Sequence, residues 1–369
     1  MRIAFYAPLK PPDHPTPSGD RRVAQLFLDA LHLAGHQPFV ASRRRSFDAA
    51  GDRLRQARRA NLAQGDAGRL LRSWRQQPGA APELWFTYHL YYKAPDWLGP
   101  RISAVLGIPY IVGEASSAPK RRGDRWDNGE RAVEEALRQA AAVIGLNPAD
   151  RDCVVPLLRD PQRWIAFPPF LDARRYKAHE ARPAEVAPRL IAVAMMRPGD
   201  KLASYRLLGA ALTGLLDLEW SLDIVGDGEA RAAVEMALAP LGARVRYRGT
   251  LDEDEIAAAL AAADLFVWPA INEAFGMALL EAQASGLPVV AGASGGIAGI
   301  VAAGNTGLLV PPGDVAAFAE AVRQLIGDGR AREAMGAMAR AKILREHDLP
   351  AAAARLAAAI EPLVPVRAA

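Results

Sequence analysis

Short apolar segments alternate with alanine-rich segments of helical character along the whole chain. Short, continuous apolar runs are typical of strands that are buried on both faces of a parallel sheet. Parallel neighbours need a crossover connection, usually a helix, and the intervening segments supply one. The pattern predicts an α/β fold of doubly wound parallel sheets that bind ligands at the carboxyl ends of their strands. The predicted strands are Ile3–Ala7, Pro38–Ala41, Leu84–Tyr88, Tyr110–Val112, Ala142–Leu146, Ile165–Phe167, Leu190–Ala194, Ser221–Val225, Arg244–Tyr247, Leu265–Trp268, Pro288–Ala291 and Gly307–Val310.

The length of 369 residues predicts two domains, because single hydrophobic cores rarely grow that large. A proline-rich, charged stretch without apolar periodicity, 168–188, separates the two halves. We therefore expect a first domain over 1–172, a linker over 173–188 and a second domain over 189–346.

One cysteine, Cys153, excludes a disulfide framework and a cysteine metal site. No apolar run approaches the length of a transmembrane helix. The first residues, MRIAFYAP, are predicted to form a strand rather than a signal peptide. The simplest compartment for such a chain is the cytoplasm.

Two glutamates, Glu273 and Glu281, bracket a turn and the start of a predicted helix. We expect the first helical amides near Phe275, Gly276 and Met277, where a helix N-terminus suits a phosphate or a polar sugar. Eight residues of helix span about 12 Å, so the two carboxylates can hold two ends of one extended polar ligand. A sugar linked through diphosphate to a ribose is such a ligand.

The segment E-A-F-G-M-A-L-L-E, followed by A-Q-A-S-G-L-P-V-V-A and S-G-G, resembles the donor-site signature of the family 4 retaining glycosyltransferases. These enzymes have the GT-B fold, in which two Rossmann-like domains face a cleft. The resemblance extends from about Leu190 to Asp328. It implies a first domain that binds the acceptor, a second that binds a nucleotide-sugar donor, and a C-terminal helix, about 347–369, that returns to the first.

The resemblance also assigns roles to this segment. Glu273 would position the donor sugar and Glu281 the ribose. The backbone of the turn and first helical residues would contact the donor at Phe275, Gly276, Met277 and Ala278.

A loop rich in cations follows the first strand of the second half, in LIAVAMMRPGDK. Arginine binds phosphate bidentately, and lysine binds it as a point charge. The family places an arginine and a lysine after this strand to hold the donor diphosphate, which implies that role for Arg197 and Lys201. The family lysine is usually followed by glycine, whereas Leu202 follows here.

Two further turns of the second half resemble donor-site turns of the family. Gly226, in LDIVGDGE, lies in a glycine turn, where backbone can approach a ligand or reverse direction. Gly249 and Leu251, in YRGTL, follow the next strand, where the family recognises the base through its backbone. The acidic run 252–254 resembles a D-x-D metal motif of another fold, but we expect it to cap a helix and to bind no metal.

The stretch Gly292–Gly299, GASGGIAG, resembles a dinucleotide fingerprint and makes a Rossmann dehydrogenase the main rival interpretation. Asp314 lies near the distance expected for a ribose-binding acid. The helix that could follow has room for only about two turns, which is short for a crossover. The glutamate pair would also remain unexplained. In the sugar-transfer interpretation these glycines form the loop under the diphosphate, although the family usually has glutamate where Gly299 stands.

The first half of the chain matches the family's motifs less closely. Gly19, in the turn Ser18-Gly19-Asp20, partly matches a glycine loop that faces the donor phosphate in the family. His89 and Glu114 follow neighbouring strands, and either could polarise an acceptor hydroxyl. Aromatic residues nearby could line an acceptor platform or pack the domain: Tyr88, Tyr91, Tyr92 and Trp97.

Positive charge is concentrated in the first half. Residues 1–185 hold 29 Lys and Arg against 20 Asp and Glu, whereas the rest hold 16 against 21. Much of the excess lies in 43–75, where leucines and Trp74 are interleaved with arginines. Such a segment is typical of an anionic membrane surface contact or of a solvated helix face. We expect no nucleic-acid partner, because no nucleic-acid motif accompanies the charge.

These features predict a metal-independent, retaining glycosyltransferase without a cofactor other than its donor. Its acceptor would be a glycan or a lipid-linked saccharide, and the protein would be cytoplasmic or peripheral on the inner membrane face. A nucleotide-sugar epimerase on the same fold and a non-catalytic nucleotide-sugar sensor are the alternatives. The sequence leaves the donor base, the donor sugar, the linkage and the oligomeric state open.

Overall fold

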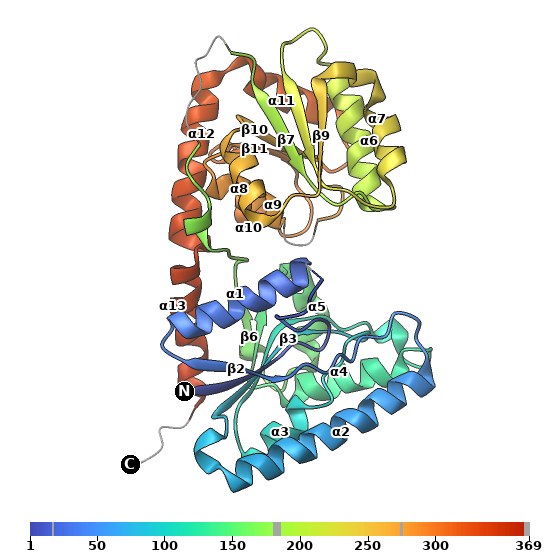
Figure 1. Cartoon of the computed structure of the whole chain (residues 1–369), viewed down its shortest axis with the longest axis vertical. Helices are drawn as coiled ribbons and strands as arrows, with labels where there is room; N and C mark the ends of the chain where they lie inside the picture. Colours follow the sequence, from blue (N-terminus) through green and yellow to red (C-terminus); the bar gives the residue numbers. More distant parts are fainter. Residues whose placement is uncertain (17, 180–185, 274–275, 365–369) are drawn as a thin grey trace. The chain divides into compact units, whose positions relative to one another are not determined.

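The structure, a computed structural model, describes residues 1–16, 18–179, 186–273 and 276–364 (Figure 1). The chain divides into two compact units, one of Met1–Phe167 with Leu349–Ala369 and one of Pro168–Asp348. Each unit contains a six-stranded sheet in which neighbouring strands run parallel. The predicted doubly wound α/β architecture is therefore confirmed.

The first sheet has the strand order β2-β1-β3-β4-β5-β6. The order runs outward in opposite directions from the pair β1 and β3, so the carboxyl ends of these two strands form the switch point where ligands usually bind. The strands are β1 Arg2–Tyr6, β2 Gln37–Ser42, β3 Leu84–Leu90, β4 Tyr110–Ala115, β5 Ala142–Gly145 and β6 Trp164–Ala166.

Helices cover both faces of this sheet, because the strand side chains alternate between two apolar faces. Phe27 of α1 packs against Phe86 and Tyr88 on one face. Helices α2, α3 and α4 pack on the other face, around Trp85. The C-terminal helix α13 lies beside α1 (Figure 1). The helices are α1 Gly19–Leu33, α2 Arg53–Gln76, α3 Gly99–Leu106, α4 Asp127–Gln139, α5 Arg151–Val154 and α13 Leu349–Ile360.

The second sheet has the order β12-β11-β10-β7-β8-β9, with its switch point between β7 and β10. All twelve predicted strands are present in the two sheets, with ends that differ by up to three residues from the prediction. The strands of this unit are β7 Arg189–Val193, β8 Ser221–Val225, β9 Val245–Gly249, β10 Leu265–Trp268, β11 Val289–Gly292 and β12 Gly307–Val310.

Two groups of helices enclose the second sheet. Helix α6 packs with α7 and α11, while α9 packs with α8 and α12. The helices are α6 Asp200–Thr213, α7 Arg231–Leu238, α8 Glu253–Ala261, α9 Met277–Ala284, α10 Ile297–Ile300, α11 Val315–Gly327 and α12 Gly329–Lys342, and a π-helical turn spans Ile343–His347.

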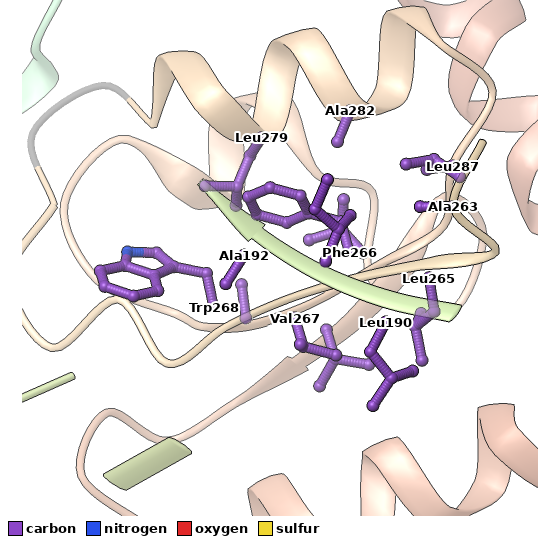
Figure 2. Packing of buried hydrophobic residues seen from close by; sticks show 14 of the residues in the cluster. Leu190, Ala192, Ala263, Leu265, Phe266, Val267, Trp268, Leu279, Ala282 and Leu287 are labelled. Atoms are coloured by element: carbon purple, nitrogen blue, oxygen red, sulfur yellow. The ribbon is translucent and has the colours of Figure 1, made fainter. Parts of the chain in front are cut away.

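The central strand β10 shows how the second core is built. Every residue of this strand is buried, as expected for a strand covered on both faces. Phe266 points toward Leu279 and Ala282 of α9, whereas Val267 points away from them (Figure 2). The strand is thereby held rigidly, and its carboxyl end at Trp268 leads into the candidate site.

The segment after the first unit packs onto the second. Leu171, Ala173 and Tyr176 lie in the core of the second unit. The Leu171 amide donates to the His347 carbonyl at 3.0 Å, and the Ala173 amide donates to Asp348 Oδ1 at 2.9 Å. The points where the chain enters and leaves the second unit are therefore tied to each other within that unit.

Candidate functional site

The loops that follow β7 and β10 meet at the switch point of the second sheet. Lys201, in the first turn of α6, donates from Nζ to Glu273 Oε2. Asn272 Nδ2 donates to Asp200 Oδ2 at 2.9 Å, which makes a second contact between the same two loops. The side chains of Lys201 and Glu273 are 27% and 20% exposed, so both remain accessible to a ligand. The structure thus brings together two predicted site residues that are 72 positions apart.

Trp268, which was not predicted as a site residue, lies beneath this ion pair. Its ring centroid is 5.5 Å from Lys201 Nζ, within cation–π range, and its indole N–H donates to Glu273 Oε2 at 3.4 Å. Tyr205 packs edge-on against Trp268, and its hydroxyl donates to the Ala194 carbonyl at 2.8 Å. A buried aromatic pair therefore supports both charged groups. The position of Trp268 at the end of a predicted strand was the signal available in the sequence.

The glycine-rich segment supports the same loop. Ser294 Oγ accepts a hydrogen bond from the Glu273 amide at 3.2 Å, and its hydroxyl donates to the Ala270 carbonyl. Ala270 has a positive φ of 49°, which non-glycine residues rarely adopt. The following helix α10 spans only Ile297–Ile300, too short for the crossover of a dinucleotide-binding unit. In this chain the segment 292–296 fixes the conformation of the Glu273 loop.

Arg197 is exposed in the loop between β7 and α6, and the described residues offer its side chain no hydrogen-bonding or ionic partner. The backbone of this loop is held by the turn after β8. The Met196 amide donates to the Asp227 carbonyl at 2.9 Å, and the Ala230 amide donates to the Met196 carbonyl at 3.0 Å. A Cβ at Gly226 would collide with the Ala194 carbonyl. Glycine is therefore required at position 226 because the backbone of Ala194 lies against it, and not because a ligand does.

Gly249 and Leu251 lie next to this turn. The Gly249 carbonyl accepts from the Gly226 amide at 2.8 Å, and Gly249 has a positive φ of 70°. Leu251 is half-buried and packs against the core of the second unit. Both predicted positions thus adjoin the turn that supports the Arg197 loop.

Helix α9 begins at Met277, later than the expected start near Phe275. Gly276 precedes it in a left-handed conformation with φ 65°, which a glycine adopts without strain and which interrupts the helix. The Leu279 and Leu280 amides both donate to the Gly276 carbonyl. The first-turn amides therefore belong to Met277 and Ala278, and Phe275 lies outside the described residues.

Glu281 is half-buried on the second turn of α9. The acidic run 252–254 forms a helix cap, as predicted. Asp252 caps α8, and its side chain and that of Glu255 form a reciprocal capping box. Among the described residues, no three His, Cys, Asp or Glu side chains gather closely enough to hold a metal ion.

In the first unit, His89 and Asp20 meet at the switch point of the sheet. His89 Nδ1 lies 2.9 Å from Asp20 Oδ1, within hydrogen-bond distance. Gly19 and Asp20 open α1, whose N-cap Ser18 accepts from the Arg21 amide at 3.2 Å. His89 has a positive φ of 60°, a strained conformation of the kind that clusters at functional sites. Asp20 was not predicted, although its place beside Gly19 in the first βα turn was a usable signal.

Glu114 lies on the neighbouring strand β4 and also has a positive φ, 66°. Its Oε2 accepts from the Leu146 amide at 3.3 Å, while burial and the nearby Asp150 raise the pKa of Glu114 to about 8. Burial also raises the pKa of Asp150, which follows β5 and was not predicted. The carboxyl ends of three neighbouring strands thus carry a histidine, a buried glutamate and a half-buried aspartate, which are residue types that move protons.

The four aromatic residues considered for an acceptor platform divide into two groups. Tyr88 is buried against Phe27, and Trp97 packs against the core of the first unit. Tyr91 and Tyr92 are half-buried after β3, and the Tyr91 ring lies 5.0 Å from the His89 ring. Only the second pair is placed to contact a ligand.

The basic segment 43–75 is partly neutralised within the first unit. Asp66 pairs with both Arg44 and Arg69, and Arg43 pairs with Asp13. Leu71 and Trp74 are buried in the core, so they do not add to an exposed apolar face. The exposed arginines of this segment that form no ion pair among the described residues are Arg45, Arg53, Arg58, Arg72 and Arg75, and Leu54 and Leu62 are exposed as well.

Residues 187–328 match the family model of glycosyl transferases group 1. The 2-deoxystreptamine glucosyltransferase of Streptomyces kanamyceticus is 31% identical to the chain over 251 residues. This match covers 62% of the chain and 64% of that enzyme, so the chain spans less than two thirds of its relative's length.

Two solved structures share the whole architecture. The sucrose-phosphate synthase of Thermosynechococcus elongatus superposes with a TM-score of 0.73 at 20% identity, covering 98% of the chain and 99% of that structure. Anabaena HepE in complex with UDP gives a TM-score of 0.73 at 17% identity, covering 98% of the chain and 100% of that structure. These likenesses confirm the GT-B fold. No helix within the described residues is both long and apolar enough to cross a bilayer.

Proposed function

We propose that this chain is a group 1 glycosyltransferase, which transfers a sugar from a nucleotide-diphosphate sugar to a hydroxyl group of an acceptor. The observation that carries this proposal is the Lys201–Glu273 ion pair at the switch point of the second sheet. The pair offers a cation for phosphate and a carboxylate for sugar hydroxyls at one place. A protein with this fold, HepE, binds UDP, which supports a donor sugar that is linked to a nucleoside diphosphate.

In this proposal the donor separates the two charges. Glu273 accepts hydrogen bonds from the sugar hydroxyls, and Lys201 turns to the diphosphate beside Arg197. The Met277 and Ala278 amides at the start of α9 face the donor, and Glu281, on the next turn, accepts hydrogen bonds from the ribose. The turns at Gly226, Gly249 and Leu251 hold the nucleotide end.

The reaction breaks the bond from the anomeric carbon to the diphosphate oxygen through an oxocarbenium-like state. Negative charge grows on the departing phosphate, and Lys201 and Arg197, already turned to the diphosphate when the donor bound, stabilise this charge without further movement. The departing phosphate takes the proton of the acceptor hydroxyl, which attacks from the same face. The product therefore retains the anomeric configuration of the donor, and no step requires a metal ion.

The first unit binds the acceptor in this scheme. His89 or Glu114 orients an acceptor hydroxyl, and the Asp20 carboxylate fixes the imidazole of His89. The acceptor is a glycan or a lipid-linked saccharide, and the exposed arginines of α2 hold the enzyme at an anionic membrane surface on the cytoplasmic side.

Turnover with a panel of nucleotide-diphosphate sugars and hydroxyl acceptors tests the proposal. We expect release of nucleoside diphosphate that depends on the acceptor, and proton NMR of the product should show the donor's anomeric configuration. Conversion of a nucleotide sugar to its isomer without acceptor would indicate an epimerase instead. Donor binding without turnover on any acceptor would indicate a sensor. Inverted configuration would refute the retaining mechanism.

A further inference from the structure

Three cations of the first unit converge on two aromatic rings after β3 and β4. Trp126 has the guanidinium of Arg125 at 4.3 Å from its ring centroid, that of Arg121 at 5.0 Å and the Lys93 ammonium at 5.4 Å. Lys93 and Arg121 also lie over Tyr92, at 5.7 Å and 5.3 Å. We call Tyr92, Lys93, Arg121, Arg125 and Trp126 the cation–aromatic cluster.

At two glycines, the backbone packs directly against residues of this cluster. A Cβ at Gly51 would press on the Arg125 side chain and the Trp126 ring, and a Cβ at Gly129 would collide with the Tyr92 carbonyl. The Trp126 indole N–H donates to the Asp48 carbonyl at 3.3 Å, so a third segment joins the two loops. The cations therefore sit on a rigid support, which reduces the entropy lost when they bind a ligand.

The neighbouring carboxylates neutralise the cluster only in part. Asp124 pairs with Arg121 at 3.1 Å and interacts electrostatically with Arg125, and Asp127 pairs with Arg131. Among the described residues, neither Lys93 nor Arg125 forms an ion pair. The Nε of Arg121 is buried and has no hydrogen-bond partner within the described part of the chain. Like charges held close together repel, and a bound anion relieves that repulsion.

The N-terminus of α4 adds to the positive electrostatic potential of the cluster. Trp126 occupies the N-cap position, where it provides no side-chain acceptor for the first-turn amides. A helix N-terminus without a capping side chain favours an anionic group nearby. Asp127, an acidic residue in the first turn, partly meets this preference through its charge, while its carboxylate accepts a hydrogen bond from the Gly123 amide in the preceding loop at 2.9 Å.

A row of aromatic rings links the cluster to His89. Neighbouring ring centroids are 5.0 Å apart from His89 to Tyr91, 5.7 Å from Tyr91 to Tyr92 and 5.6 Å from Tyr92 to Trp126. An anion at the cluster and a hydroxyl at His89 would therefore lie at two ends of one row of packed rings, in which Tyr91 and Tyr92 are half-buried and Trp126 is buried.

We propose that the cation–aromatic cluster binds a phosphate group of the acceptor, so that the acceptor is a phosphorylated saccharide whose hydroxyl is oriented by His89. This inference rests on the proposed function in assigning the acceptor to the first unit. Lys93 and Arg125, which form no ion pair among the described residues, supply the N–H donors, and Arg121 adds positive charge beside the same two rings. The phosphate can belong to a soluble sugar phosphate or to a lipid headgroup.

Calorimetric titration of the full chain with glucose 6-phosphate and with glucose tests the site. We expect the phosphate ester alone to bind, more weakly as salt rises. Lys93→Ala and Arg125→Ala should each weaken it about tenfold, the loss of one charge-assisted hydrogen bond. Arg159→Ala removes an exposed arginine outside the cluster and serves as the matched control. The same proteins are titrated with phosphatidylglycerol vesicles and with neutral vesicles.

Selective loss of vesicle binding in Lys93→Ala and Arg125→Ala, without sugar phosphate binding, would support the site with a lipid headgroup as its source of phosphate. Equal binding by all variants, or no binding of either phosphate probe, would overturn it. A lower melting temperature in Arg125→Ala with unchanged affinity would also overturn it, since the cluster would then only brace the loops. UDP binding, measured in parallel, reports on the proposed donor site, so the two proposals fail separately.

Discussion

At the scale of single residues, the candidate donor site depends on an ion pair whose members come from different strand ends. Lys201 and Glu273 neutralise each other, and Trp268 contacts both. A charged pair that is partly accessible exchanges its internal partner for a ligand at little cost, because the ligand replaces one set of charge-assisted hydrogen bonds with another.

Lys201→Ala should lower kcat/KM for sugar transfer by about 100-fold or more, the loss typical of one group that stabilises developing charge. Initial rates of nucleoside diphosphate release measure the effect. Arg206→Ala, which removes an exposed cation from the same helix, should retain the wild-type rate. Equal rates for Lys201→Ala and Arg206→Ala would remove Lys201 from the mechanism, and a wild-type rate for Glu273→Ala would remove Glu273.

Glu114→Gln should change how stability depends on pH. The folded-state pKa of Glu114 is about 8, above its ordinary value of 4.5, so the folded protein retains a proton that the unfolded chain releases. This contribution is fully present below pH 4.5 and is lost as the pH rises to 8. The wild-type melting temperature should therefore fall more steeply between pH 5 and pH 8 than that of Glu114→Gln, by differential scanning calorimetry. Parallel curves for the two proteins would contradict a raised pKa.

Gly226→Ala should destabilise the second unit by more than about 1 kcal/mol, because φ is 134° there and the Ala194 carbonyl occupies the space of the new methyl group. Urea denaturation measures the loss. The control is Gly327→Ala, where nothing obstructs a Cβ and the new residue lies in a helix. If both variants matched the wild-type stability, the inference that the Gly226 turn supports the Arg197 loop would be refuted.

At the scale of elements, the sequence predicts which strand each site residue follows but not how the strands are ordered. Arg197 and Glu273 each follow a predicted strand, and only the order β7 next to β10 makes their loops neighbours. That order depends on packing between residues far apart in the chain. The positive φ angles of His89, Glu114 and Ala270 were also beyond prediction, because such residues adopt them only when the surrounding fold imposes them.

Helix α2 illustrates the same limit. Its composition predicts a basic amphipathic element, and the structure divides its residues between salt bridges, core packing and an exposed remainder. The cations around Trp126 come from positions 93, 121 and 125 and form no local motif, so only the structure brings them together.

The exposed face of α2 leads to a prediction for that element. Arg58→Ala, Arg72→Ala and Arg75→Ala should each weaken binding to anionic vesicles by about 1 kcal/mol, the contribution of one basic residue near such a surface. Vesicle sedimentation at low and high salt measures it. Arg159→Ala is again the control. Binding that is indifferent to lipid charge and to salt would rule out the membrane contact.

At the scale of the whole molecule, the two doubly wound units carry different candidate sites. The second unit carries the family match and the candidate donor site, and the first carries His89, the buried Glu114 and the cation–aromatic cluster. Apolar strand runs and helix signals were sufficient to predict two parallel sheets. They do not indicate where the chain returns; that expectation, of a helix over about 347–369, came from the family resemblance alone, and helix α13 groups with the first unit through packing beside α1.

The measurement that tests the central claim most directly is a thermal-shift titration with nucleoside diphosphates and their sugars, comparing wild type, Glu281→Ala and Arg206→Ala. A ligand that binds only the folded protein raises the melting temperature by mass action. The account predicts stabilisation by one nucleotide series, reduced in Glu281→Ala and unchanged in Arg206→Ala, each relative to its own unliganded protein. No shift with any nucleotide sugar, together with a shift on NAD or NADP, would contradict it and would assign ligand binding to the glycine-rich loop after β11.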